Sequence, residues 1–192
     1  MTWEECKTQI SLDLKRLTNI NKWGGVKYIM TNASFRITFW FRIGCYLKEK
    51  RNWFHKILYG IVFLIHKHNQ YLTGIQIAFG TQIGSGLTFS HFSCIVINSG
   101  AIIGKNCTIF QGVTIGSIRG IKGGVPTIGD NVIIFAGAKI IGNVKIGNNT
   151  VIGANAVVTH NIPDNSVAVG IPAKVISNNS KNMAQLHKSV AI

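Results

Sequence analysis

The sequence predicts a mainly β protein: a parallel β-helix, in which short strands stack in triangular coils, preceded by an α-helical N-terminal region. Two observations predict this fold. Aliphatic residues recur every six positions in the second part of the chain, and from about residue 73 glycine and β-branched residues replace aromatic and basic ones. An α-helix would show a period of 3.6 and a hairpin strand a period of 2, so a period of six indicates coils of three short strands.

The period predicts which side chains point into each coil. One large aliphatic residue per repeat faces inward, and neighbouring coils stack at about 4.8 Å. The longest run is Ile128, Ile134, Ile140, Ile146, Ile152 and Val158. An upstream run is Ile97, Ile103, Ile109 and Ile115, and an earlier run, two residues out of phase, is Ile77, Ile83, Phe89 and Ile95. Corners need residues that tolerate positive φ, and the candidates are Asn131, Asn143, Gly147, Asn148 and Asn149.

These patterns divide the chain into three segments. We interpret residues 1–72 as a helical region, basic and rich in aromatics, with 12 Lys and Arg against four acids. We expect residues 73–176 to form the β-helix. The spacing from Ile115 to Ile128 is 13 residues, which is not a multiple of six, so we expect residues 116–126 to form a loop expelled from the coil. Residues 177–192 are interpreted as a polar tail.

The formal charge of +14 predicts an anionic partner or surface. A membrane, an acidic glycan or a cofactor's phosphates would all qualify, but without a recognisable nucleic-acid module we expect no nucleic-acid partner. The four cysteines show no CxxC pair, which favours free thiols in a reducing cytoplasm. The polar N-terminus predicts no secretory signal, and the longest apolar run, residues 57–65, is far shorter than the roughly 20 residues of a membrane span.

Six motifs between Gly86 and Ile176 resemble those of the hexapeptide-repeat acyltransferases, nearest the serine O-acetyltransferase branch. They are GLTFSHFSCIVIN at 86–98, IFQGVTIG at 109–116, PTIGDNV at 126–132, AGAKIIGNVKIG at 136–147, IGANAVV at 152–158 and VGIPAKVI at 169–176. The resemblance implies a left-handed parallel β-helix, a hand that the spacing itself does not predict. It also implies a homotrimer with acetyl-CoA in the grooves between subunits. Short members of this branch often belong to surface-polysaccharide pathways and carry a similar basic N-terminus.

His91 is the candidate catalytic base. The resemblance implies this role, because transfer of an acetyl group from a thioester to an alcohol requires removal of the alcohol's proton, and a neutral imidazole can accept it. Two alternatives are a structural histidine within a coil, and Cys94 as a nucleophile that forms an acetyl-enzyme beside His91. A buried, inert thiol is the commoner role for such a cysteine. We expect His66 and His68, on the helical segment, to be solvated or interfacial.

Four residues are expected at acetyl-CoA. Gly137, Ala138 and Ala156 are small enough for the pantetheine arm to lie close to the backbone. Lys174, in a PAK motif, would meet a CoA phosphate as a point charge. The alternative roles of these residues are coil packing and a solvated lysine. We expect no metal, because the cysteines and histidines show no metal-type spacing.

The acceptor is expected to be a sugar hydroxyl of a surface polysaccharide or its precursor. Two aspartates of the serine enzymes align with neutral Ser90 and Gln76, which suit sugar hydroxyls, and a loop histidine aligns with Val125. A serine pocket would need an acid near the ammonium group. Arg119 and Lys122 in the loop suit an anionic glycan. The alternatives are a serine O-acetyltransferase of cysteine biosynthesis and an inactive β-helix scaffold protein.

Residues 35–68 mix apolar side chains with basic ones, as an interfacial helix does. We therefore expect a peripheral contact with an anionic membrane, at the inner face of the plasma membrane. The alternative is that these apolar residues pack on the β-helix or on a neighbouring subunit. The basic residues of the segment are Arg36, Arg42, Lys48, Lys50, Arg51, Lys56 and Lys67.

Overall fold

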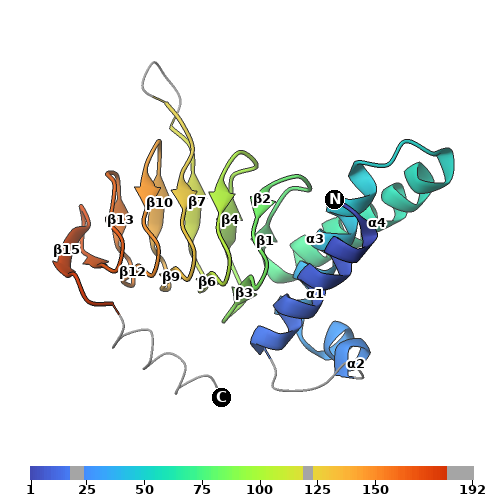
Figure 1. The fold of residues 1–192 in the computed structure, drawn as a ribbon, viewed down its shortest axis with the longest axis horizontal. Coiled ribbons are helices and arrows are strands. Elements are labelled where there is room, and N and C mark those ends of the chain that lie inside the picture. The colour runs from blue at the N-terminus through green and yellow to red at the C-terminus, as the bar shows by residue number, and fades with distance from the viewer. Residues whose placement is uncertain (18–23, 119–122, 181–192) are drawn as a thin grey trace.

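The computed structural model describes residues 1–17, 24–118 and 123–180. These residues form a three-sided β-helix whose N-terminal end is covered by α-helices (Figure 1). The helices are α1 (Trp3–Leu17), α2 (Gly24–Thr31), α3 (Ala33–Lys48) and α4 (Trp53–Thr73). α3 packs against each of the other three, and α1, α3 and α4 also contact the first strands of the β-helix.

Each face of the prism is one sheet. The first sheet has the order β1 (Ile75–Gln76), β4 (Ile95–Ile97), β7 (Thr114–Gly116), β10 (Lys139–Ile141) and β13 (Val157–Val158). The second has the order β11 (Lys145–Ile146), β8 (Thr127–Ile128), β5 (Ile102–Ile103) and β2 (Gln82–Ile83). The third has the order β15 (Lys174–Ser177), β14 (Val167–Val169), β12 (Val151–Ile152), β9 (Ile133–Ile134), β6 (Thr108–Ile109) and β3 (Thr88–Phe89). Among these strands every pair is parallel except β14 with β15.

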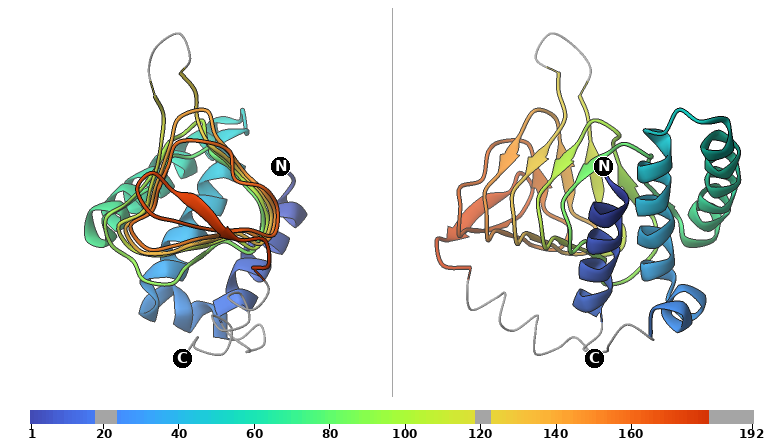
Figure 2. Two further views of the ribbon diagram at one scale, coloured as in Figure 1. Left: turned by 90° about the vertical axis from the view of Figure 1, so that its left-hand side faces the viewer. Right: turned by 45° about the vertical axis from the view of Figure 1, so that its right-hand side comes forward.

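The predicted aliphatic runs form the core of the prism. In the first sheet Ile97 pairs with Ile115, Ile115 with Ile140 and Ile140 with Val158. All four side chains are buried, and burial of each contributes about 1.5–3 kcal/mol. Because each coil stacks its aliphatic residues directly on those of the next, the coils superpose when viewed along the prism (Figure 2).

A ladder of asparagines holds one corner of the prism. Asn106, Asn131, Asn149 and Asn165 have φ angles between 54° and 57°, which is the left-handed region that asparagine tolerates. Each Nδ2 donates to the Oδ1 of the next asparagine, over 3.2, 3.0 and 3.0 Å. The expected corner role is therefore confirmed for Asn131 and Asn149, whereas the other three candidates do not have positive φ.

A buried ion pair attaches the helices to the first coil. Asp13 of α1 and Arg42 of α3 are only 0% and 2% exposed. The guanidinium donates to both carboxylate oxygens, from Nε over 2.8 Å and from Nη2 over 3.3 Å. It also donates to the carbonyl oxygens of Ile83 and Gly84, over 2.7 and 2.6 Å. Arg42 therefore binds the backbone of the first coil and the acid of α1 together.

The carboxylate of Asp13 binds the coil as well. Its Oδ1 accepts hydrogen bonds from the backbone N–H groups of Gly86 and Leu87, over 2.7 and 3.0 Å. Burial raises the pKa of Asp13, while Arg42 and the two N–H groups lower it. Since an unpaired buried charge is costly, the pair fixes α1, α3 and the strand that precedes Ser90 in one arrangement.

The two helices of residues 35–68 differ in their packing. Residues of α3 such as Phe35, Ile37 and Phe41 are buried, and Gly44 allows close contact, because an added Cβ would lie 2.2 Å from the ring of Phe79. The expected packing on the β-helix therefore holds for α3. α4 instead exposes an apolar side, called here its outer face, which comprises Trp53, Phe54, Ile57, Ile61, Leu64 and Leu72. No helix among the described residues is long and apolar enough to cross a membrane.

The four cysteines are free thiols. Cys6 and Cys107 are completely buried, and burial raises the pKa of each thiol to about 11. Burial also raises the pKa of Cys45. These three thiols remain protonated near neutral pH and are unsuited to nucleophilic chemistry. Cys94 is the exposed one.

Replacing Asp13 with Asn should destabilise the fold by about 3–5 kcal/mol, because the buried Arg42 would lose its counter-charge. Urea denaturation measures the loss as a lower midpoint. Glu4→Gln is a matched control on the same helix, since it removes the exposed ion pair of Glu4 with Lys7 and should cost about 0.5 kcal/mol or less. Equal midpoints for Asp13→Asn and the unmodified protein would contradict the role of the pair.

Candidate active site

His91 lies in a bulge at one corner of the first coil. Phe89 pairs with Ile109, and Ile97 pairs with Ile115. The first coil spans eight positions from Phe89 to Ile97, whereas the next spans six from Ile109 to Ile115. The two additional residues explain the shift in phase between the aliphatic runs. They leave His91 exposed, outside the regular stack.

The bulge is anchored on both sides. The N–H of Ser90 donates to the carbonyl of Ile109 over 3.1 Å, and the carbonyl of Ser93 accepts the N–H of Gly112 over 2.9 Å. Gly74, which ends α4 with a φ of 67°, packs on the bulge: an added Cβ would lie 2.9 Å from the backbone nitrogen of Cys94. The segment that carries His91 is thus held by the next coil and by the end of α4.

Aromatic side chains continue from His91 along the same edge of the prism. The centroid of the imidazole lies 5.9 Å from that of Phe110 in the next coil. Phe110 stacks on Phe135, one coil further, with centroids 4.9 Å apart. Ser90, next to His91, is half-buried, whereas Cys94 is exposed. The Oγ of Ser93 donates to the Cys94 sulfur over 3.5 Å.

Lys139 brings a positive charge to this corner, and the sequence did not predict it. Its Nζ donates to the carbonyl of Gly112 and, over 3.1 Å, to the Oγ1 of Thr114. Gly112 is the residue whose N–H holds Ser93, in the coil next to the bulge, so Lys139 of β10 lies two coils beyond the bulge. The available signal was a lysine in the AGAKIIG motif, at a strand position where the two neighbouring coils carry Thr114 and Val157.

The four residues expected at acetyl-CoA differ in how accessible they are to a ligand. Gly137 is half-buried at the same edge as Phe110 and has a φ of 74°, and Lys174 is exposed on β15. Ala138 and Ala156 are completely buried, with their methyl groups in the core of the coil. Gly137 and Lys174 are therefore the two of the four that a ligand can reach in the described structure.

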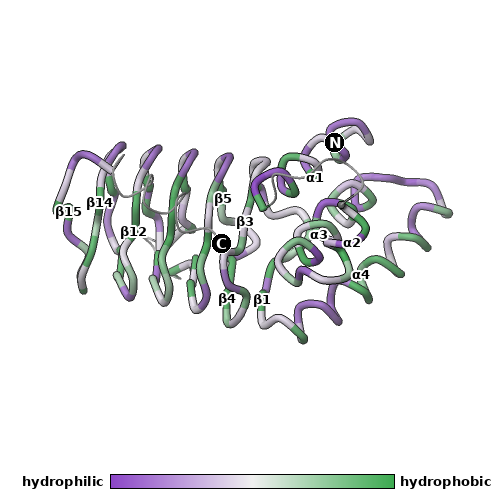
Figure 3. Tube along the Cα trace, turned by 90° about the horizontal axis from the view of Figure 1, so that it is seen from below, coloured by the Kyte–Doolittle hydropathy of each residue, from purple (hydrophilic) through white to green (hydrophobic). Residues whose placement is uncertain are grey.

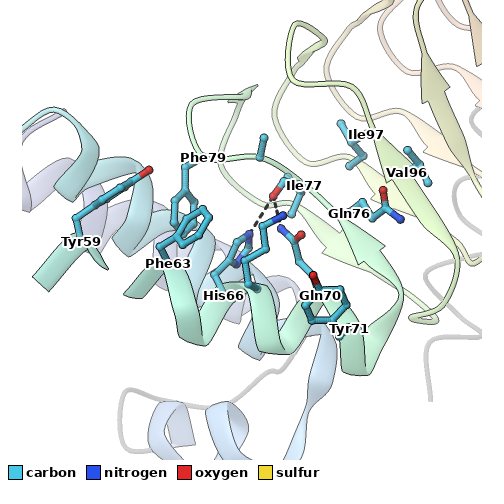
Figure 4. Close-up of a pocket in the computed structure, with 12 residues that line it drawn as sticks. Tyr59, Phe63, His66, Gln70, Tyr71, Gln76, Ile77, Phe79, Val96 and Ile97 are labelled. Carbon is cyan, nitrogen blue, oxygen red and sulfur yellow. Dashed lines mark hydrogen bonds between the residues drawn. The ribbon is translucent and has the colours of Figure 1, made fainter. Parts of the chain in front are cut away.

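Gln76 lies in a groove of about 580 Å³ between α4 and the first coil (Figure 4). α4 contributes aromatic side chains such as Tyr59, Phe63 and Tyr71, and β4 contributes Val96. No hydrogen bond joins Gln76 to His91 among the described residues. The structure does not bring all of the expected acceptor residues together: Ser90 lies beside His91, Gln76 lines the groove, and Arg119 and Lys122 lie outside the described residues.

His66 forms part of the wall of this groove and is 2% exposed, so the expectation that it is solvated or interfacial is wrong. Its Nε2 lies 2.9 Å from the carbonyl oxygen of Ile77 and must donate, since a carbonyl only accepts. The ring stacks on Phe79 with centroids 4.4 Å apart, and Nδ1 is buried without a hydrogen-bond partner. Burial lowers the pKa of His66, so the imidazole is neutral in the folded protein.

Comparison with known proteins identifies the repeats. Residues 126–160 match the family described as bacterial transferase hexapeptide (six repeats). The chain belongs to the hexapeptide-repeat transferases. The serine acetyltransferase of Bacillus subtilis (strain 168) is 39% identical over 140 residues, which make up 68% of this chain and 64% of the relative. That of Staphylococcus xylosus is 41% identical over 133 residues, or 69% of this chain and 62% of the relative. The chain therefore spans somewhat under two thirds of the length of these curated relatives.

Solved structures agree with this family. A serine acetyltransferase of Neisseria gonorrhoeae in complex with serine has a TM-score of 0.74 and 26% identity, over 91% of this chain and 70% of that chain. A serine acetyltransferase in complex with CoA has a TM-score of 0.73 and 25% identity, over 91% and 71%. The predicted fold of this hexapeptide-repeat protein, a left-handed parallel β-helix with an N-terminal helical region, is confirmed.

The buried His66 should make the stability of this protein depend on pH. An unfolded histidine binds a proton below about pH 6.5, but His66 resists protonation in the fold because its pKa is lowered. The stability that it contributes is complete above about pH 6.5 and is lost as the pH falls. Thermal unfolding from about pH 7.5 to about pH 5 should show a smaller loss in His66→Gln than in the unmodified protein. His68→Gln, on the exposed side of the same helix, is the matched control: an equal reduction there would contradict the assignment to His66.

Proposed function

We propose that the protein is an acetyl-CoA-dependent O-acetyltransferase that acetylates the hydroxyl of serine, with His91 as the general base. The observation that carries the proposal is the placement of His91. It lies in an exposed bulge on a hexapeptide coil whose curated relatives, 39% and 41% identical, are named serine acetyltransferases. Solved structures of similar fold include complexes with serine and with CoA.

The expected sugar acceptor is wrong. It rested on two neutral residues, Ser90 and Gln76, at positions where the serine enzymes carry aspartates. The likeness to serine acetyltransferases extends over more than two thirds of this chain and outweighs these two positions. A serine acceptor then requires that its ammonium group be bound by neutral oxygen atoms, and the hydroxyl of Ser90 beside His91 is one candidate. Arg119 and Lys122 would suit the carboxylate of serine.

Direct transfer of the acetyl group needs a group that accepts the proton of the attacking hydroxyl and later donates a proton to the leaving CoA sulfur. In the proposed reaction the imidazole of His91 takes the hydroxyl proton of serine as its oxygen attacks the thioester carbonyl. The tetrahedral intermediate then collapses, the C–S bond breaks, and the leaving CoA sulfur takes the proton from the imidazolium. Gly137 and Lys174 are the accessible residues for the pantetheine arm and a phosphate. Cys94 takes no part, so no acetyl-enzyme forms.

The purified protein should release free CoA thiol from acetyl-CoA when serine is added, with kcat/KM above roughly 10⁴ M⁻¹s⁻¹. His91→Ala should lower kcat by roughly 10²–10⁴-fold, because the base is lost. His160→Ala, which removes another exposed histidine, and Cys94→Ser should keep most of the activity.

Two results would contradict the proposal in different ways. Absence of thiol release with serine would remove serine as the acceptor, and absence with every hydroxyl acceptor would favour the inactive scaffold. An acetyl adduct on Cys94, detected by mass spectrometry after incubation with acetyl-CoA alone, would replace direct transfer with an acetyl-enzyme.

The proposal includes a homotrimer. A single prism leaves outward apolar side chains exposed on its faces, among them Val96 of β4 and Ile102 of β5, and threefold association would cover such surfaces. Light scattering should report about 63 kDa, three times the 21.0 kDa chain. A monomer that retains full activity on dilution would exclude an active site shared between subunits.

A further inference from the structure

The outer face of α4 is apolar over most of the length of the helix, with the exposed His68 between Leu64 and Leu72. Its residues recur at intervals of three, four and seven positions, which places them on one side. Figure 3 shows apolar residues recurring along α4. The opposite side, with Val62 and His66, is buried against α3 and the first coil. At 21 residues the helix is about 32 Å long, so the face is an extended surface rather than a few isolated side chains.

Basic residues accompany this face, and acids are absent. Lys50 and Arg51 precede α4, and Lys56 and Lys67 lie along one edge of it. The sequence contains no Asp or Glu between Glu49 and Asp130. An apolar stripe bordered only by positive charge is complementary to a surface of anionic headgroups above hydrocarbon. Association with a second copy would instead bring like charges together without any acid to pair with them.

The position of α4 leaves the face accessible. α4 is the outermost helix, at the end of the prism opposite β15, and α3 separates it from α1 (Figure 2). It runs obliquely outward from the first coil, away from the prism (Figures 1 and 3). A flat surface can therefore approach the outer face without meeting the coils.

We propose that the outer face of α4 docks the protein on the surface of an anionic lipid bilayer. The helix lies in the headgroup region with its apolar side chains among the upper acyl chains, and its basic residues pair with the headgroups. This inference does not depend on the acceptor of the proposed reaction. In the proposed trimer, rotation about an axis parallel to the prism would place all three copies of α4 at the same end.

Flotation of the full-length protein with vesicles tests the proposal. The protein should float with phosphatidylglycerol–phosphatidylcholine vesicles at low salt and not with phosphatidylcholine alone. Leu64→Glu, at the centre of the outer face, should weaken partitioning about tenfold or more. Ile176→Glu is the matched control: both side chains are similarly exposed, 68% and 65%, but Ile176 lies on β15 at the far end of the prism. The control should float like the unmodified protein.

A second variant tests how much the basic residues contribute to vesicle binding. Arg51→Gln with Lys56→Gln removes two exposed basic residues and should weaken partitioning about 30-fold, since each such residue near an anionic surface is worth about fivefold. Failure of the unmodified protein to float, or equal losses in Leu64→Glu and Ile176→Glu, would overturn the proposal. If the unmodified protein does not float and light scattering shows that Leu64→Glu forms a smaller assembly than the unmodified protein, the outer face is an interface between copies of the chain instead.

Discussion

Stacking of the coils is the constraint on which the rest of the structure depends. Each strand pairs with the equivalent strand of the next coil, so every coil must present the same number of residues on each face. Residues in excess of that number can only leave the stack at a corner. The excess occurs in the bulge around His91 and in the segment between β7 and β8. A rigid scaffold thus carries a reactive side chain on an irregular segment whose two ends are fixed by neighbouring coils, which is how sites on regular folds commonly arise.

The ion pair of Asp13 and Arg42 extends this constraint to the helices. Its charges are neutralised only when α1, α3 and the turn before β3 are together, so the helices cannot shift without exposing a buried charge. The turn leads through β3 directly to Ser90 and His91. The helical region is therefore part of the support of the site, although none of its residues lies in the bulge.

Periodicity predicted the coil and its inward residues, because stacking imposes a local, repeating requirement on the sequence. The sequence also showed the shift in phase before Ile97. Only the register of β3 with β6 and of β4 with β7 shows that the two additional residues project outward with His91. Contacts outside the coils left no such pattern: Arg42 and Asp13 lie on two helices, at positions that no repeat relates. His66 was misjudged because basic neighbours suggested solvent, whereas its side of α4 packs on the first coil. The acceptor was misjudged because two neutral residues were weighed above the likeness of the whole domain.

α4 connects the proposed chemistry with the proposed membrane contact, because its two sides face different surroundings. On the inner side, His66 and Gln70 both donate to the carbonyl of Ile77, over 2.9 and 2.6 Å, next to Gln76 in the groove. These buried hydrogen bonds fix the helix to the first coil. An α-helix with its side chains is about 10–12 Å across. Docking through the outer face would therefore hold the groove about one helix diameter above the headgroups, and the bulge, which packs on Gly74 at the end of α4, would be held with it. The position of the site relative to the lipid surface would then follow from the packing of a single helix.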